Sequence, residues 1–273
     1  MRDRIVVATD FSINSLTSIT KAMYLAKKRK CSLDVVHIVE YSIFHNAKKD
    51  KKAGKQALAK FIAEHFPEPE VEISQFCYVG TIYKEIHKHA KNRGCCLLVI
   101  GATGETQHLT DIFLGSVAKR IVRKSEIPVL VTKDESLPDY ENVISPTDFS
   151  EDSLKTAKAT RKLFADVNLI FYHMIARPFE LRLGHYGASD EQISSFNKDS
   201  EEQAKEVSRK FLKNCSFKSE VVLDSGILSC ARLLSVAESK NASLIALPTS
   251  GKISFFALDV LQNSNIDVFI CKF

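Results

Sequence analysis

The sequence predicts an α/β protein made of two tandem copies of a doubly wound, mainly parallel sheet that helices cover on both faces. Short apolar runs of strand length alternate with segments whose apolar residues recur every three or four positions. The pattern then restarts near residue 143. The run ending at Ser150 repeats the run ending at Ser12 almost letter for letter, 138 positions later. This internal duplication indicates two similar folding units.

Five strands are expected in the first copy, at residues 4–9, 33–39, 71–76, 97–100 and 127–132. Strand 71–76 alternates apolar and polar residues as an edge strand does. Ser12 or Asn14 is expected to cap the first helix, and the next helices are expected at 47–65, 81–92 and 117–124. In the last of these, Val117, Ile121 and Val122 share one side of the helix.

The second copy repeats these elements, with strands expected at 143–147, 168–175, 243–248 and 266–270 and a helix at 190–214. A polar segment that contains Pro138 lies between the copies. We therefore predict domains at residues 1–137 and 138–273.

Composition narrows the possible functions. The 273 residues are 45% hydrophobic and 26% charged, and no apolar run approaches the length of a membrane span. Seven cysteines without a Cys-x-x-Cys pair, and no signal peptide, predict a cytoplasmic protein. Residues 1–137 hold 22 Lys and Arg against 15 Asp and Glu, whereas the remainder holds 16 against 18. The basic excess favours an anionic ligand in the first half. No aromatic residues interleave with the basic run 48–52, so nucleic-acid binding is not expected.

A glycine-rich stretch is the candidate site. Strand 97–100 runs into Gly101 and Gly104, and Gly115-Ser116 follows ten residues later at the start of a helix. A strand, a glycine loop and a helix N-terminus can hold a phosphate, because free N–H groups and the helix dipole converge there. The alternative interpretation is that Gly101 and Gly104 only form a turn after the strand and bind no ligand.

Several stretches together resemble the universal stress protein family in its tandem two-domain form. They are the strand ending in Ala-Thr-Asp-Phe-Ser, then Val-Val-His-Ile-Val-Glu, Val-Ile-Gly-Ala-Thr-Gly, Leu-Gly-Ser-Val-Ala-Lys-Arg-Ile-Val-Arg, and the closing Ile-Pro-Val-Leu-Val. The resemblance implies an adenine nucleotide alpha hydrolase-like sheet of five strands in each domain, in the order 3-2-1-4-5, with ligands where the strand order reverses. It also implies adenine-nucleotide binding in some members. Those members have nine residues where this chain has ten between Gly104 and Gly115.

The resemblance implies the following site, carried over residue by residue. Base and ribose would contact Ala8, Thr9, Asp10 and Val39, and the phosphates would contact Ile100, Gly101, Thr103, Gly104, Gly115, Ser116 and Val117. The alternative role of Asp10 is to cap a strand-to-helix turn. In the second copy Pro248 replaces Gly101, and Ser254-Phe255 replaces Gly115-Ser116. Because proline lacks an N–H and Phe255 is expected to fill the phosphate space, no nucleotide site of this kind is predicted there.

Catalytic motifs are not found: the loop lacks the Gly-Lys-Ser/Thr of a P-loop, and no nucleophile elbow is present. His87 and His89 are two apart on a helix, so one metal ion would not take both. His37 and His173 each lie on a strand and are interpreted as core histidines.

We therefore expect a stress-response protein that binds ATP, with or without Mg²⁺, in its first half, with little or no turnover. It would act as a regulatory or interaction module on an unknown protein partner. The two copies would pack against each other within one chain, as the two subunits of a dimer do. Whether two copies of the whole chain also form a homodimer is not decided by the sequence. The alternatives are a nucleotide-free interaction module and a slow metal-assisted ATP hydrolase.

Overall fold

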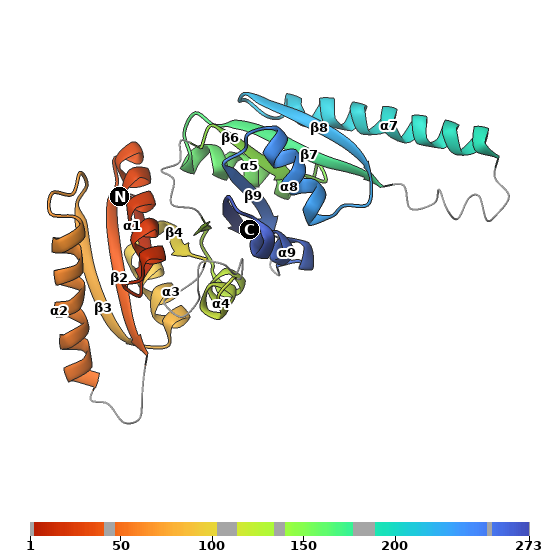
Figure 1. Ribbon diagram of the computed structural model, residues 1–273. Helices are drawn as coiled ribbons and strands as arrows, with labels where there is room; N and C mark the ends of the chain where they lie inside the picture. Colours follow the sequence, from red (N-terminus) through yellow and green to blue (C-terminus); the bar gives the residue numbers. More distant parts are fainter. Residues whose placement is uncertain are drawn as a thin grey trace.

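The computed structural model describes residues 3–40, 47–102, 114–133, 140–176, 189–249 and 253–272. Within these ranges ten strands form one sheet in the order β3-β2-β1-β4-β5-β10-β9-β6-β7-β8 (Figure 1). The strands are β1 Arg4–Thr9, β2 Ser32–Glu40, β3 Ile73–Gly80, β4 Cys95–Gly101, β5 Val129–Thr132, β6 Asn142–Pro146, β7 Asn168–Ala176, β8 Ser219–Gly226, β9 Leu244–Thr249 and β10 Asp267–Lys272.

Each half of the sheet has the predicted strand order, 3-2-1-4-5, and β3 lies at an edge as expected. The structure adds that the two halves form one continuous sheet. Strands β5 and β10 pair antiparallel, with Leu130 opposite Phe269, whereas the other paired strands run parallel. Because of this antiparallel pairing, the two halves of the chain are arranged like the two subunits of a symmetric dimer.

Helices cover both faces of the sheet. They are α1 Ile13–Arg29, α2 Ala47–His65, α3 Ile82–Arg93, α4 Ser116–Lys124, α5 Glu151–Leu163, α7 Asp190–Lys213, α8 Cys230–Ser239 and α9 Phe255–Asn263. One apolar core contains buried residues of α1, α2, α5 and α7, and the other contains those of α3, α4, α8 and α9. Each core includes strand residues of both halves, so the hydrophobic layers continue across the β5–β10 junction. No helix among the described residues is both long and apolar enough to span a bilayer.

The helix boundaries follow local sequence signals. Of the two candidate caps, Ser12 is the one used, because its side chain accepts a hydrogen bond from the Ser15 backbone N–H. Helix α2 has the predicted bounds. One expectation about α4 is wrong: its buried face is Ala118, Ile121 and Val122, while Val117 is 42% exposed. Val117 lies in the first turn, where the helix has only begun to cover the sheet.

Helix α2 packs closely on the sheet at Gly54. A Cβ atom there would lie 2.7 Å from Cys77 Sγ and 3.0 Å from Val39 Cγ2. We expect Gly54→Ala to lower the free energy of unfolding by about 1–2 kcal/mol, because overlap with a short buried side chain outweighs the better helix propensity of alanine. Urea unfolding measures the change. Removing the sulfur in the double variant Gly54→Ala/Cys77→Ala should recover part of the loss, and a more stable single variant would contradict the prediction.

Candidate functional site

The turn between β1 and α1 is built by hydrogen bonds among its own side chains. Thr9 Oγ1 accepts from the Phe11 N–H at 3.0 Å and lies 2.9 Å from Ser15 Oγ. Asp10 Oδ1 accepts from the Ser12 N–H at 3.1 Å and from the Ser12 hydroxyl. Asp10 therefore holds Ser12, and the N-cap itself is Ser12 and not Asp10 as the alternative supposed. Asp10 is exposed at the mouth of the turn.

The second half repeats the backbone hydrogen bonds of this turn, with one side-chain difference: Ser153 Oγ donates to Asp148 Oδ1, whereas Ser15 Oγ contacts Thr9 Oγ1. Asp148 Oδ1 accepts from the Ser150 N–H at 3.0 Å. Phe11 and Phe149 both adopt left-handed backbone angles, with φ of 67° and 61°. Their rings contact His37 and His173, with centroids 4.2 and 4.4 Å apart. This contact offsets the cost of a left-handed phenylalanine.

The two histidines are structural, as expected. His37 Nδ1 lies 2.9 Å from the Thr9 carbonyl oxygen, and His173 Nδ1 lies 2.8 Å from that of Thr147. Because a carbonyl only accepts, each Nδ1 carries the proton and donates. Each histidine thereby ties the second strand of its half to the end of the first.

The predicted site residues gather where the strand order reverses. Strand β1 lies between β2 and β4, and Val7 pairs with Val99, so the ends of β1 and β4 are adjacent. This places Ala8 and Asp10 beside Ile100 and Gly101, with Val39 near the end of β2. The carboxyl ends of parallel strands, at the point where the strand order reverses, are a typical ligand position. Thr103 and Gly104 lie outside the described residues.

Helix α4 begins at the same edge of the sheet without a side-chain cap. Gly115 is its N-cap, and no side chain in the part of the chain that the structure describes accepts from its first turn. The Gly115 N–H donates to the Ala102 carbonyl at 2.8 Å, which corrects the expectation that this amide faces a ligand. Ser116 and Val117 are exposed in the first turn, where amides lack intrahelical partners. These two positions are therefore the better anion donors.

The charges of the two equivalent helices differ. Helix α4 carries four Lys and Arg residues and no acidic residue, whereas α9 has one acidic and no basic residue. The N-cap of α9 is Ser254, whose Oγ accepts from the Ala257 N–H at 3.1 Å. The first half is thus the better place for an anion.

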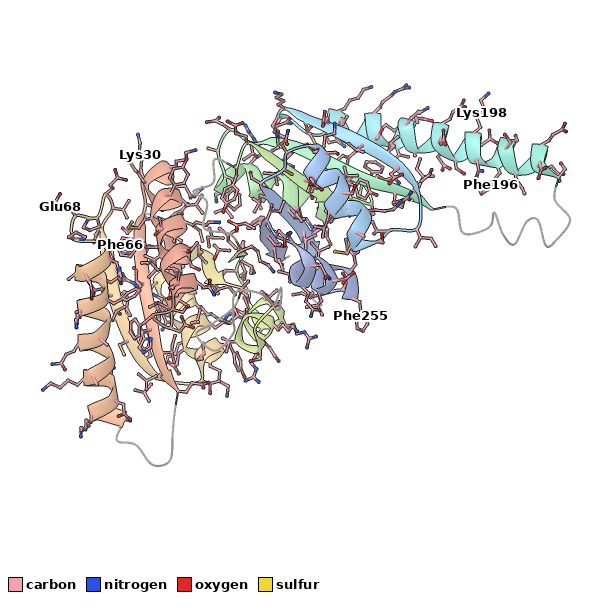
Figure 2. The ribbon with its side chains drawn as sticks, in the orientation of Figure 1. Lys30, Phe66, Glu68, Phe196, Lys198 and Phe255 are labelled. Carbon is pink, nitrogen blue, oxygen red and sulfur yellow. The ribbon has the colours of Figure 1, made fainter. Side chains whose placement is uncertain are left out.

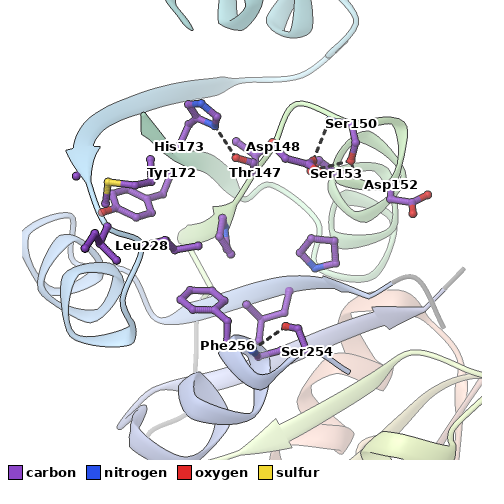
Figure 3. A pocket seen from close by; sticks show the side chains of 17 residues that line it. Thr147, Asp148, Ser150, Asp152, Ser153, Tyr172, His173, Leu228, Ser254 and Phe256 are labelled. Atoms are coloured by element: carbon purple, nitrogen blue, oxygen red, sulfur yellow. Dashed lines mark hydrogen bonds between the residues drawn. The ribbon is translucent and has the colours of Figure 1, made fainter. Parts of the chain in front are cut away.

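A pocket of about 540 Å³ lies at the equivalent edge of the second half (Figure 3). It is lined by Pro146, Thr147, Asp148, Ser150, Asp152, Ser153, Tyr172, His173, Met174, Gly226, Ile227, Leu228, Leu247, Pro248, Ser254, Phe256 and Ala257. The expectation that Phe255 fills this space is wrong. Its side chain is 92% exposed and points away from the protein, and Phe256 lines the pocket instead (Figure 2). Sequence reasoning missed the pocket, because which of two adjacent phenylalanines turns inward depends on where α9 begins.

A second polar cluster is fully buried between β2, α3 and β4. Ligand atoms of Asp34, His89 and Cys95 lie within 4.8 Å of one another, as in a metal site. However, Asp34 already accepts from Arg4 at 3.0 Å, from Arg93 at 3.0 Å and from His89 at 3.0 Å. Burial raises the pKa of the Cys95 thiol to about 12. Two guanidinium groups on the carboxylate and a protonated thiol disfavour a cation, so the cluster is an ion-pair network.

Comparisons with known proteins agree with this architecture. Residues 1–133 match the family model described as the universal stress protein family. A universal stress protein of Methanocaldococcus jannaschii is 31% identical over 140 residues, which cover 48% of this chain and 81% of that protein. One from Bacillus subtilis is 27% identical over 150 residues, which cover 49% of this chain and all of that protein.

Solved structures match the whole chain. The crystal structure of a universal stress protein from Archaeoglobus fulgidus covers 98% of both chains, with a TM-score of 0.71 and 18% identity. One from Pseudomonas aeruginosa covers all of this chain and 93% of its own, with a TM-score of 0.68 and 14% identity. At these identities the similarity concerns the fold of both halves together.

Proposed function

Because the chain belongs to the universal stress protein family, we propose that its first half binds ATP, with Mg²⁺ as the accompanying ion, and that binding regulates contacts with a protein partner. The observation that carries the proposal is the start of α4, a basic helix without a side-chain cap at the point where the strand order reverses. Free amides and the positive end of the helix dipole at that point suit a phosphate chain.

The nucleotide would lie across the ends of β1 and β4. The amides of Ser116 and Val117 would donate to phosphate oxygens, and the Asp10 carboxylate would accept from the ribose or the base. Ala8 and Val39 would line the base and sugar, and Ile100, Gly101, Thr103 and Gly104 would form the phosphate loop as the family resemblance implies. The Thr9 side chain would hold the turn in shape, since its hydroxyl already contacts Phe11 and Ser15.

Binding of a nucleotide at this position would also affect the second half, through helix α1. That helix begins at the Asp10 turn, and its Lys21 bonds to Asp267 of β10. A shift of the turn on binding would therefore act on the junction of the halves. This coupling offers a route from nucleotide occupancy to a partner surface.

Isothermal titration with ATP and Mg²⁺ tests the proposal. We expect one ATP per chain and an affinity about tenfold or more weaker in Ser116→Glu, because a carboxylate at the first helical position repels the phosphates. The fold should persist, since an acidic residue stabilises a helix N-terminus. The matched control is Phe255→Glu, which adds the same charge at the first position of α9; it should bind ATP as the parent does. No heat and no thermal shift at millimolar ATP would instead favour the nucleotide-free module.

A further inference from the structure

The second-half pocket lies at the carboxyl ends of its own strands, the position equivalent to the proposed ATP site, but has different chemistry. Because β5 and β10 pair antiparallel, the two sites lie at opposite edges of the continuous sheet. Figure 3 shows Thr147 and Asp148, from the β6–α5 turn, facing Phe256 and Ser254 of α9 across the pocket. Ser254 caps the first turn of α9, so a side chain already occupies an amide that an anion would need. Pro248, which lines the pocket at the end of β9, has no N–H to offer.

The polar groups of the pocket are mostly acceptors. Two carboxylates line it, those of Asp148 and Asp152, and none of the described lining residues is Lys or Arg. Partial burial opposes ionisation, yet hydrogen bonds from Ser150 and Ser153 outweigh it and lower the pKa of Asp148. His173 donates through Nδ1 to the Thr147 carbonyl, which leaves Nε2 as an acceptor in the neutral ring.

Among the residues that the structure describes, two cations near the pocket, Arg232 and Lys155, are already paired. Arg232 of α8 donates to the Ser225 carbonyl at 2.7 Å and lies 3.7 Å from Asp224. Lys155 lies 3.3 Å from both Asp152 and Glu151 at the solvent-facing side of α5. Asp148 forms no ion pair with either residue. It is therefore the carboxylate best placed to attract a cationic ligand.

The remaining wall is apolar and partly open. Phe256, Leu247 and Met174 line the interior, and Leu228 and Ile227 lie at the β8–α8 connection with 43% and 82% of their surface exposed. Exposed aliphatic groups next to a cavity of this size can cover a planar ring. Combined with acceptors on the opposite side, they suit a ring that carries a positive N–H donor.

We propose that the second-half pocket binds a small aromatic amine, with its ring between Phe256 and Leu228 and its ammonium group at Asp148. A phosphate or carboxylate on the same ring weakens binding, because it meets two carboxylates and a capped helix. The site is independent of ATP binding in the first half.

Three indoles test this proposal; each has a two-carbon side chain, which ends in an ammonium group in tryptamine, an uncharged hydroxyl in tryptophol and a carboxylate in indole-3-propionate. Binding to the full chain is measured by isothermal titration and by ligand-observed NMR. We expect tryptamine to bind most tightly and indole-3-propionate most weakly. Asp148→Asn should weaken tryptamine by about three- to fivefold, the range for a partly exposed ion pair, and leave tryptophol unchanged. Asparagine retains the oxygen that caps the turn, so the fold is preserved.

The matched control is Glu151→Gln, which removes one negative charge three residues further along, at the first position of α5, where the side chain does not line the pocket. It should leave the order and the affinities of the three indoles unchanged. Equal or tighter binding of indole-3-propionate, or no binding of tryptamine at millimolar concentration, would overturn the proposal. So would an equal effect of the two variants. Both variants are also titrated with ATP. Because neither substitution lies in the first half, ATP binding should be unchanged, so a failure of the amine proposal can be told apart from a failure of the ATP proposal.

Discussion

Replacing Lys21 by Met is expected to lower the free energy of unfolding by about 3–5 kcal/mol, the cost of leaving one member of a buried ion pair without the other. Lys21 on α1 and Asp267 on β10 are each 1% exposed, and Lys21 Nζ lies 2.8 and 3.0 Å from the two carboxylate oxygens. Methionine retains most of the length and volume of the lysine side chain without its charge, so the loss reports mainly the charge rather than a cavity.

Asp267 is the centre of this cluster. Tyr140 donates its hydroxyl to Oδ2 at 2.6 Å, and the Lys133 backbone N–H donates to Oδ1 at 2.7 Å. Burial raises the pKa of Asp267, and the Lys21 charge and these donors oppose that rise. Without Lys21, the carboxylate keeps its burial but loses its counter-charge, and folding becomes less favourable.

Urea unfolding followed by circular dichroism measures the effect. Lys155→Met is the matched control, because Lys155 forms exposed pairs with Glu151 and Asp152 and its loss should cost under about 0.5 kcal/mol. The double variant Lys21→Met/Asp267→Asn should recover part of the stability, since a neutral amide still accepts from Lys133. A loss below about 1 kcal/mol in Lys21→Met would show that the pair contributes little.

The second large effect is expected at Asp34, in the buried network with Arg4, His89 and Arg93. Burial alone would raise the pKa of Asp34, but hydrogen bonds from His89 and Arg93 and their charges outweigh it and lower the pKa to about 2. The ordinary value is 3.8, so the folded state favours the ionised form. We expect Asp34→Asn to lower the free energy of unfolding by about 2 kcal/mol at pH 7.

The pH dependence has a definite sign. Since the folded pKa lies below the unfolded one, the contribution of Asp34 is complete above about pH 4 and is lost as the pH falls towards 2. At pH 3 the difference between parent and Asp34→Asn should be about half its value at pH 7. Urea unfolding at several pH values measures it. Glu70→Gln is the control, because the Lys27–Glu70 pair is exposed and should show little change. A difference that is constant from pH 7 to 3 would contradict the assignment.

Much of the candidate site was predictable because its signals are local. The turn residues from Thr9 to Ser12 recur at 147–150, and Asp and Ser cap strand-to-helix turns wherever they occur in this pattern. Grouping Ala8 and Asp10 with Ile100 and Gly101 needed only the strand order that the family resemblance implies. Their role toward a nucleotide stays a prediction. Two details could not be predicted from neighbouring residues in the sequence. The Gly115 N–H donates to the Ala102 carbonyl, and the Phe255 side chain is exposed.

By itself the sequence determined the duplication, the order of strands in the first copy, and the loss of the first glycine of the loop at Pro248, because periodicity and residue type act over a few neighbouring positions. Strand β8 and helices α5, α8 and α9 of the second copy were not predicted. Only the tertiary structure decided the rest. Strands β5 and β10 join two sheets into one, Lys21 meets Asp267 across 246 positions, and an acceptor-rich pocket opens where the sequence predicted a filled space. These features depend on which buried surfaces meet after the chain folds, and no local pattern encodes that choice.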